Sequence, residues 1–255
     1  MPSSPTELYR RHFPAYGRFS VLITICAILI LLSQSGCFLK KSKSEPVQNT
    51  TSVRLVLLPF NVPAGDKELQ WTALAAPILM AKTGGKSESL DLIPLWETMP
   101  YARDNAGTSR SFTPETAANV ATWLSAKWSA MGEMKMTPAK NEVSMVVDFI
   151  PSRSNQVAFR YLKKDKIDSL GDGFNDAYIQ FLRYLVTKPL APSKKSDTLT
   201  SVKSLAEAID REYGWFVEAD PGKAQDVVNS LIQTDERLAR FLFSPTLYPA
   251  LAVKK

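Results

Sequence analysis

The hydrophobic positions between residues 53 and 190 switch between strand-like and helix-like spacing. The segment 54–60 (RLVLLPF) is a nearly continuous apolar run, which is typical of a strand covered on both faces. A helical pattern with Asp66 as its N-cap follows and stops at Gly84 and Gly85. The segment 90–95 (LDLIPL) predicts a second strand.

The second half of this region adds a helix, three strands and a further helix. Residues 113–115 (TPE) combine a capping hydroxyl, proline at the first helical position and an acid in the first turn, which marks a helix start. Strand patterns follow at 128–136, 143–150 and 156–162, and a helical pattern at 173–187. The order predicts an α/β (α+β) fold, a mixed sheet with flanking helices over residues 53–190.

The C-terminal part of the chain is predicted to be helical. Residues 191–199 (APSKKSDTL) are typical of a linker, and residues 200–255 form the C-terminal helical segment. Three short amphipathic helices are expected there, the second capped at Asp220 and the third at Thr234.

The N-terminus has the pattern of an export signal, and we assign residues 1–36 to a signal peptide. Arg10, Arg11 and Arg18 precede the apolar run 19–32 (FSVLITICAILILL). Fourteen residues make a helix of about 21 Å, shorter than the roughly 30 Å hydrocarbon core of a bilayer. A cleaved signal is therefore favoured over a permanent anchor.

Small residues stand directly before a cysteine at the end of this signal. Ser35, Gly36 and Cys37 resemble the lipobox of bacterial lipoproteins, with Gln34 in place of the usual aliphatic residue. The resemblance implies cleavage before Cys37, diacylglycerol on its thiol and an N-acyl chain such as palmitate on its new amino group. The alternative is a plain thiol near the end of a membrane helix.

The resemblance also implies a location and a tether. No aspartate follows Cys37, and by the sorting rule of Gram-negative lipoproteins this favours the periplasmic face of the outer membrane. Residues 37–52 are polar after Leu39 and serve as a lipidated tether. The expected partner of this part of the chain is the membrane, through the lipid anchor.

The scarcity of histidine and cysteine restricts the chemistry of the folded part. His12, Cys26 and Cys37 are the only such residues. Catalysis by a Ser-His-Asp or Cys-His set and a zinc site with histidine or cysteine ligands are therefore excluded after Cys37. We predict no catalytic residue, no metal and no small-molecule cofactor. A carboxylate-dependent glycan hydrolase using Glu207 and Asp210 is the less favoured alternative.

Two further motifs have simple structural interpretations. Residues 84–87 (GGKS) lack the first glycine of a phosphate loop and fit the end of a helix. Asp168, Asp172 and Asp176 lack the spacing and the distant glutamate of a calcium loop, which favours a turn and helix cap.

The positive charge is modest and dispersed. Residues 1–36 contribute three arginines and one glutamate to the net charge of +6, so removal of the signal leaves +4. No basic stripe with interleaved aromatic residues is present, and we predict no nucleic-acid partner.

The region 53–187 resembles the amino-terminal domain of TolB and its relatives, which include CsgG and penicillin-binding-protein activator lipoproteins. The resemblance rests on the run 54–60 ending in Pro-Phe, on the helix after Asp66, and on residues 117–132 (AANVATWLSAKWSAMG). It implies a non-catalytic accessory protein that binds another envelope component. A subunit of an envelope secretion or assembly complex is the alternative.

One aromatic pair fits neither neighbouring helix. Trp215 and Phe216 lie between Gly214 and Val217, outside the helical registers on either side. We therefore predict them as a contact patch for the protein partner.

Overall fold

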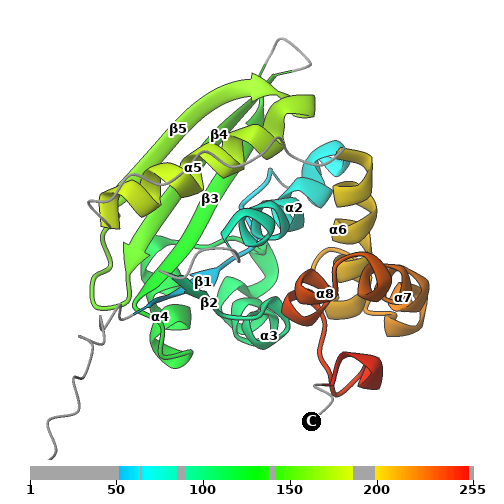
Figure 1. Ribbon diagram of the computed structural model, residues 1–255. Coiled ribbons are helices and arrows are strands. Elements are labelled where there is room, and N and C mark those ends of the chain that lie inside the picture. The colour runs from blue at the N-terminus through cyan, green and yellow to red at the C-terminus, as the bar shows by residue number, and fades with distance from the viewer. Residues whose placement is uncertain (1–51, 64, 85–89, 138–141, 186–198, 253–255) are drawn as a thin grey trace, which may run out of the picture. The chain divides into compact units, whose positions relative to one another are not determined.

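The computed structural model describes residues 52–63, 65–84, 90–137, 142–185 and 199–252 (Figure 1). Cys37, the signal peptide, nearly all of the tether and most of the predicted linker lie outside these ranges. Residues 50–255 belong to one compact unit. Within the described ranges, the helices are too short or too polar to cross a membrane.

The core of this unit is a five-stranded mixed sheet in the order β2-β1-β3-β4-β5. The strands are β1 (Val53–Leu57), β2 (Leu90–Leu92), β3 (Trp128–Met136), β4 (Glu142–Pro151) and β5 (Phe159–Lys166). β1 pairs in parallel with β2 and β3, and β3, β4 and β5 pair antiparallel. The predicted α/β class, a mixed sheet with flanking helices, is confirmed.

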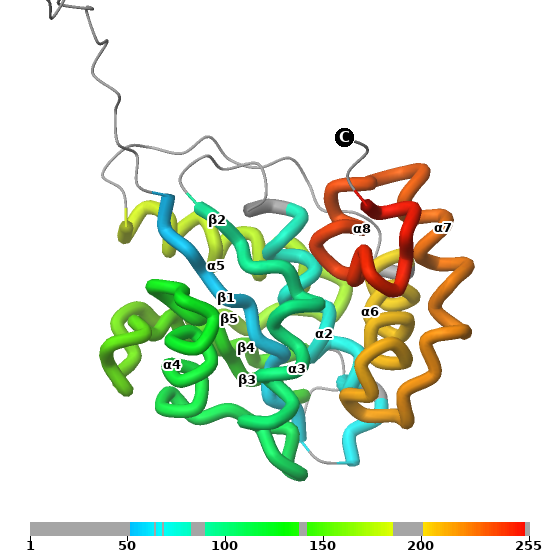
Figure 2. The backbone as a smooth tube through the Cα atoms, turned by 90° about the horizontal axis from the view of Figure 1, so that it is seen from below, coloured from blue at the N-terminus to red at the C-terminus, as the bar shows by residue number. Residues whose placement is uncertain are grey.

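Helices cover the sheet on both faces. They are α2 (Lys67–Gly84), α3 (Leu95–Ala106), α4 (Pro114–Trp123), α5 (Leu170–Leu185), α6 (Leu199–Tyr213), α7 (Gln225–Thr234) and α8 (Glu236–Leu242). α2 and α5 lie side by side over one face, and α4 packs on β1, β3 and β4. The C-terminal helices α6, α7 and α8 lie together beside α2 and α3 (Figure 2).

The prediction missed one helix and misplaced several boundaries. α3 was not expected, because Pro100 and several polar residues interrupt its sequence. β5 begins at Phe159, three residues later than predicted. β2 ends at Leu92, three residues earlier than predicted, and α5 begins at Leu170, three residues earlier than predicted. α7 begins at Gln225, after a short 3-10 turn, so Asp220 is not its cap as predicted. The cap of α8 is Asp235, whose carboxylate accepts from the Leu238 N–H at 3.0 Å, instead of the predicted Thr234.

Helix α2 has no solvent face along most of its length. Every residue from Thr72 to Ala81 is buried, as expected for a helix that is apolar all round. Pro77 has no N–H, which leaves the Ala73 carbonyl without its helical donor. The backbone N–H of Phe60 donates to this carbonyl at 2.9 Å and so connects the segment after β1 to the helix.

Two side-chain hydrogen bonds, one from α3 and one from α6, hold the end of α8 in place. The Trp96 indole on α3 donates to the Arg240 carbonyl at 3.1 Å. The Tyr213 hydroxyl on α6 donates to the Leu242 carbonyl at 2.7 Å. These bonds satisfy carbonyls in the last turn of α8, which have no donor within the helix. α6 also packs along α2.

Gly132 on β3 is required by close packing. A Cβ atom at this position would lie 2.2 Å from the Phe60 ring and 2.2 Å from the Val146 carbonyl oxygen. We expect Gly132→Ala to lower the free energy of unfolding by about 1–3 kcal/mol, because either the Phe60 ring or strand β4 must shift to make room for the methyl group. Urea unfolding measures this. Gly222→Ala is the control, since its Cβ would meet only the Asp220 carboxylate at 3.6 Å, and equal losses in both variants would contradict the packing argument.

Candidate functional site

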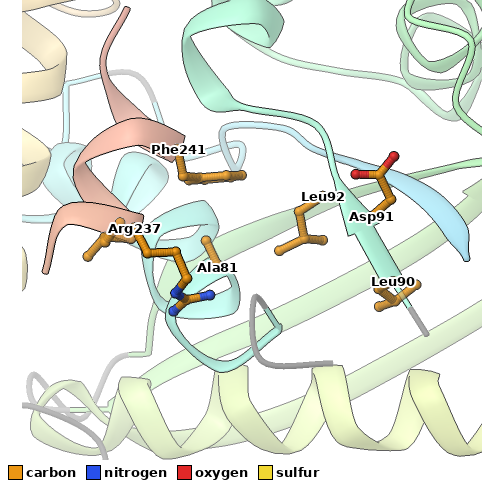
Figure 3. Close-up of a pocket in the computed structure, with 7 residues that line it drawn as sticks. Ala81, Leu90, Asp91, Leu92, Arg237 and Phe241 are labelled. Atoms are coloured by element: carbon orange, nitrogen blue, oxygen red, sulfur yellow. The ribbon is translucent and has the colours of Figure 1, made fainter. Parts of the chain in front are cut away.

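A cavity of about 240 Å³ lies where α2, β2 and α8 meet (Figure 3). Its apolar lining consists of Ala81, Leu90, Leu92, Leu238 and Phe241. Leu90 and Leu92 share one face of β2, since side chains alternate along a strand. Phe241 and Leu92 point toward each other across the cavity and are half-buried. The site therefore combines three elements that are far apart in the sequence.

Two charged residues also line the cavity. Arg237 lies one helical turn before Phe241, on the same face of α8, and its guanidinium donates to the Lys82 carbonyl at 3.4 Å. Asp91 points away from the cavity (Figure 3), and its carboxylate accepts from the Arg54 guanidinium at 3.1 Å. The cavity itself is therefore apolar with a cation at its side.

The strand beside the cavity is an edge strand. β2 pairs with β1 alone in the described sheet. The Ile93 N–H donates to the Leu55 carbonyl at 3.0 Å, so the alternation of a parallel ladder directs the N–H and C=O of Leu92 away from β1. Among the described residues these two groups have no hydrogen-bond partner.

A separate aromatic pair lies on the surface of α3 and α4. Tyr101 and Trp123 are 40% and 59% exposed, and their ring centroids lie 5.9 Å apart. Exposed tryptophan and tyrosine are common in protein-binding surfaces. The hydrophobic pattern of α4 does not separate Trp123 from its buried neighbours, so no local signal in the sequence marks Trp123 as exposed.

The predicted contact patch at Trp215 and Phe216 needs a correction. Trp215 is 1% exposed and stacks on Phe112, with ring centroids 5.8 Å apart. The Arg110 guanidinium lies 5.3 Å from the centre of the same indole ring. Trp215 therefore belongs to the core and forms no exposed patch, while Phe216 is half-buried and its role as a partner contact stays a prediction.

A carboxylate holds the turn that buries Trp215. Gly214 ends α6 with φ of +64°, a conformation that favours glycine. The Asp210 carboxylate then accepts from the N–H groups of Phe216 at 2.6 Å and Val217 at 3.4 Å. Burial raises the pKa of Asp210, and these N–H donors oppose the shift.

Two of the three carboxylates of α6, those of Asp210 and Glu212, have structural contacts. Glu207 is exposed, while Asp210 is occupied by the turn. Glu212 is buried and accepts from the Tyr248 hydroxyl at 2.6 Å. Burial raises the pKa of Glu212, and the Tyr248 hydrogen bond lowers it in part. Asp210 and Glu212 thus have structural roles at the end of α6.

The other sequence motifs add no site. Asp176 accepts from the Tyr161 hydroxyl at 2.7 Å, and Asp172 lies in the first turn of α5. Among the described residues no group of three acidic, histidine or cysteine side chains could hold a metal ion. Of the motif at 84–87, residues 85–87 lie outside the described ranges.

The contrast between the two tryptophans is testable. We expect Trp215→Ala to lower the free energy of unfolding by about 3–5 kcal/mol, because it removes a buried ring and leaves a cavity. Trp123→Ala should change it by no more than about 1 kcal/mol, because that ring is mostly solvated. Thermal and urea unfolding of both variants measure the difference. Similar losses in both would show that Trp215 is not a core residue.

The buried carboxyl of Glu212 makes stability depend on pH. Its pKa is raised above the ordinary value of about 4.5, so the folded state favours the neutral acid and loses stability as pH rises through the raised pKa. Glu212→Gln keeps an acceptor for Tyr248 and should remove this part of the decline. Urea unfolding between about pH 4 and 8 measures it. Glu207→Gln, at an exposed position, should leave the wild-type profile unchanged, and an unaltered profile in Glu212→Gln would contradict the assignment.

Comparison with known proteins gives partial matches to solved structures. No family model and no curated protein matches the chain. TolB from Acinetobacter baumannii has a TM-score of 0.37 and 11% identity over 55% of this chain and 29% of that chain. Lipoprotein GNA1162 from Neisseria meningitidis has a TM-score of 0.36 and 12% identity, covering 55% and 99%. The LpoB C-terminal domain from Salmonella enterica has a TM-score of 0.31 and 10% identity, covering 45% and 83%. The α/β class rests on the strand order and pairings of this chain.

Proposed function

We propose that this chain is a membrane-anchored envelope lipoprotein that acts as a non-catalytic binding module for another protein of the cell envelope. The observation that carries the proposal is the sequence 19–37, in which an apolar run ends in Ser35, Gly36 and Cys37. Lipid on Cys37 would hold the folded part at the periplasmic face of the outer membrane. Two or more acyl chains are needed for such stable anchoring.

The described surface offers places for a protein partner. The cavity beside β2 and the exposed pair of Tyr101 and Trp123 lie on the part of the chain that follows the tether. A tether of about 15 residues has an average reach of roughly 20–25 Å. Confinement to a layer of this thickness at the membrane surface raises the effective concentration of the module near a membrane-bound partner. The proposed mechanism is therefore positioning and binding.

The anchor is tested by lipid labelling in a Gram-negative host. We expect the wild-type chain to incorporate labelled palmitate, to begin at Cys37 by mass spectrometry and to fractionate with the outer membrane. Cys37→Ser should abolish the label and the fractionation with the outer membrane, because the thiol that carries the lipid is lost. It should also reduce by about tenfold or more the partner recovered by crosslinking in intact cells, since the effective concentration falls.

Cys26→Ser is the matched control, because it removes the other cysteine of the chain within the apolar run. It should leave labelling, cleavage and fractionation unchanged. An uncleaved precursor with unmodified Cys37 would overturn the anchor. Crosslinking of the anchored chain that yields no envelope protein would overturn the binding role.

A further inference from the structure

We propose that the cavity between α2, β2 and α8 binds the C-terminal end of an extended protein segment whose last residue is large and apolar. The last side chain would enter the cavity, and the terminal carboxylate would meet Arg237. The backbone of the segment would lie along the edge of β2 that pairs with no other described strand. The inference rests on the proposed function in taking the partner to be a protein.

The size and lining of the cavity fit a single apolar anchor. Its volume of about 240 Å³ lies below the roughly 300–1,000 Å³ of sites for drug-sized ligands. Five of the seven lining residues are apolar, and the facing side chains of Leu92 and Phe241 remain half-buried. An entering leucine or phenylalanine would cover them. Pockets that receive one buried anchor residue dominate many protein interfaces.

The charge at the cavity selects an anion. A guanidinium has five N–H donors, and the described contact of Arg237 is one long hydrogen bond to the Lys82 carbonyl at 3.4 Å. Donors therefore remain for a carboxylate, which arginine can bind through two parallel hydrogen bonds. Asp91 does not compete, because it points away and is paired with Arg54. A terminal carboxylate stands next to its own side chain, so one residue can reach both features.

The edge strand supplies the third element of recognition. The N–H and C=O of Leu92 point away from β1, as the bond from Ile93 to Leu55 requires. An extended segment can add to such an edge through its main chain, while an alternate side chain fills a neighbouring pocket. Leu90 and Leu92, whose side chains line the cavity, belong to this same short strand.

The test uses the full chain in detergent and fluorescent peptides of defined sequence. The probes are a labelled STVTL peptide with a free C-terminal carboxylate, its C-terminal amide, and a longer peptide that carries Leu-Asp internally and ends in an amide. We expect the free acid to bind at least about tenfold more tightly than either amide. Fluorescence anisotropy measures each dissociation constant.

Variants separate the two features of the cavity. Arg237→Glu should weaken binding of the free-acid peptide by about tenfold or more, because it replaces the cation with a negative charge that repels the terminal carboxylate. Arg237 is exposed. Leu92→Trp should block binding of the free acid by filling the cavity from a half-buried position. Arg183→Glu is the matched control, being an exposed arginine on α5, and should bind as the wild type does. Circular dichroism confirms that each variant is folded.

Several outcomes would overturn the inference. They are equal binding of the free acid and the amide, binding that survives Arg237→Glu, equal binding of the internal acidic peptide, or no binding of the free acid at millimolar concentration. Cys37→Ser should bind the peptide as the wild type does, since the cavity lies within the folded part. A failure of lipidation and a failure of peptide binding are therefore separate results.

Discussion

The burial of α2 on all sides is the constraint on which the rest of this structure depends. A helix with one apolar stripe needs one covering layer, whereas ten consecutive residues of α2, Thr72 to Ala81, are all buried. The sheet and α5 cover part of this surface, and α6 and α8 cover more of it. Each large apolar side chain left in water would cost about 1.5–3 kcal/mol. The C-terminal helices are thus part of the same core as the sheet.

Hydrogen bonds as well as apolar contacts connect the sheet to the C-terminal helices. The side-chain amide of Asn61, just after β1, donates to the Phe112 carbonyl at 2.9 Å and accepts from its N–H at 2.7 Å. Phe112 in turn stacks on Trp215, which the Asp210 turn holds at the end of α6. A chain of contacts therefore runs from the sheet to the C-terminal helices. Trp215, which the sequence pattern predicted at the surface, is therefore the buried residue at which these contacts end.

The sequence predicted those elements whose local pattern matches their burial. On β4, Val143, Met145, Val147 and Phe149 alternate in the sequence and are all buried on the face toward α5. The Thr113 cap of α4 was equally predictable, and its side chain accepts from the Thr116 N–H at 3.2 Å. In α3 the buried positions 95, 98, 99, 102 and 106 do follow helical spacing. Pro100 and the polar residues between them concealed that signal.

The candidate site could not be predicted, because no local pattern describes it. Leu92, Ala81 and Phe241 look like ordinary core residues in sequence, and they become cavity walls only because the space between three elements is incompletely filled. Trp215 shows the opposite case. Its irregular local register predicted exposure, yet burial is decided by Phe112, about a hundred positions earlier. Long-range packing of this kind leaves no trace in hydrophobic spacing.

The cavity lies where α2 and β2 meet α8, and this position has a physical consequence for binding. Its walls come from α2 and β2 on one side and from α8 on the other. α8 is held by the Trp96 and Tyr213 bonds and by packing on α2 and α3. Because these contacts order the walls before any ligand arrives, a partner would not have to supply the entropic cost of ordering them. A pre-formed pocket on a tethered domain then needs only modest affinity, since the anchor supplies local concentration.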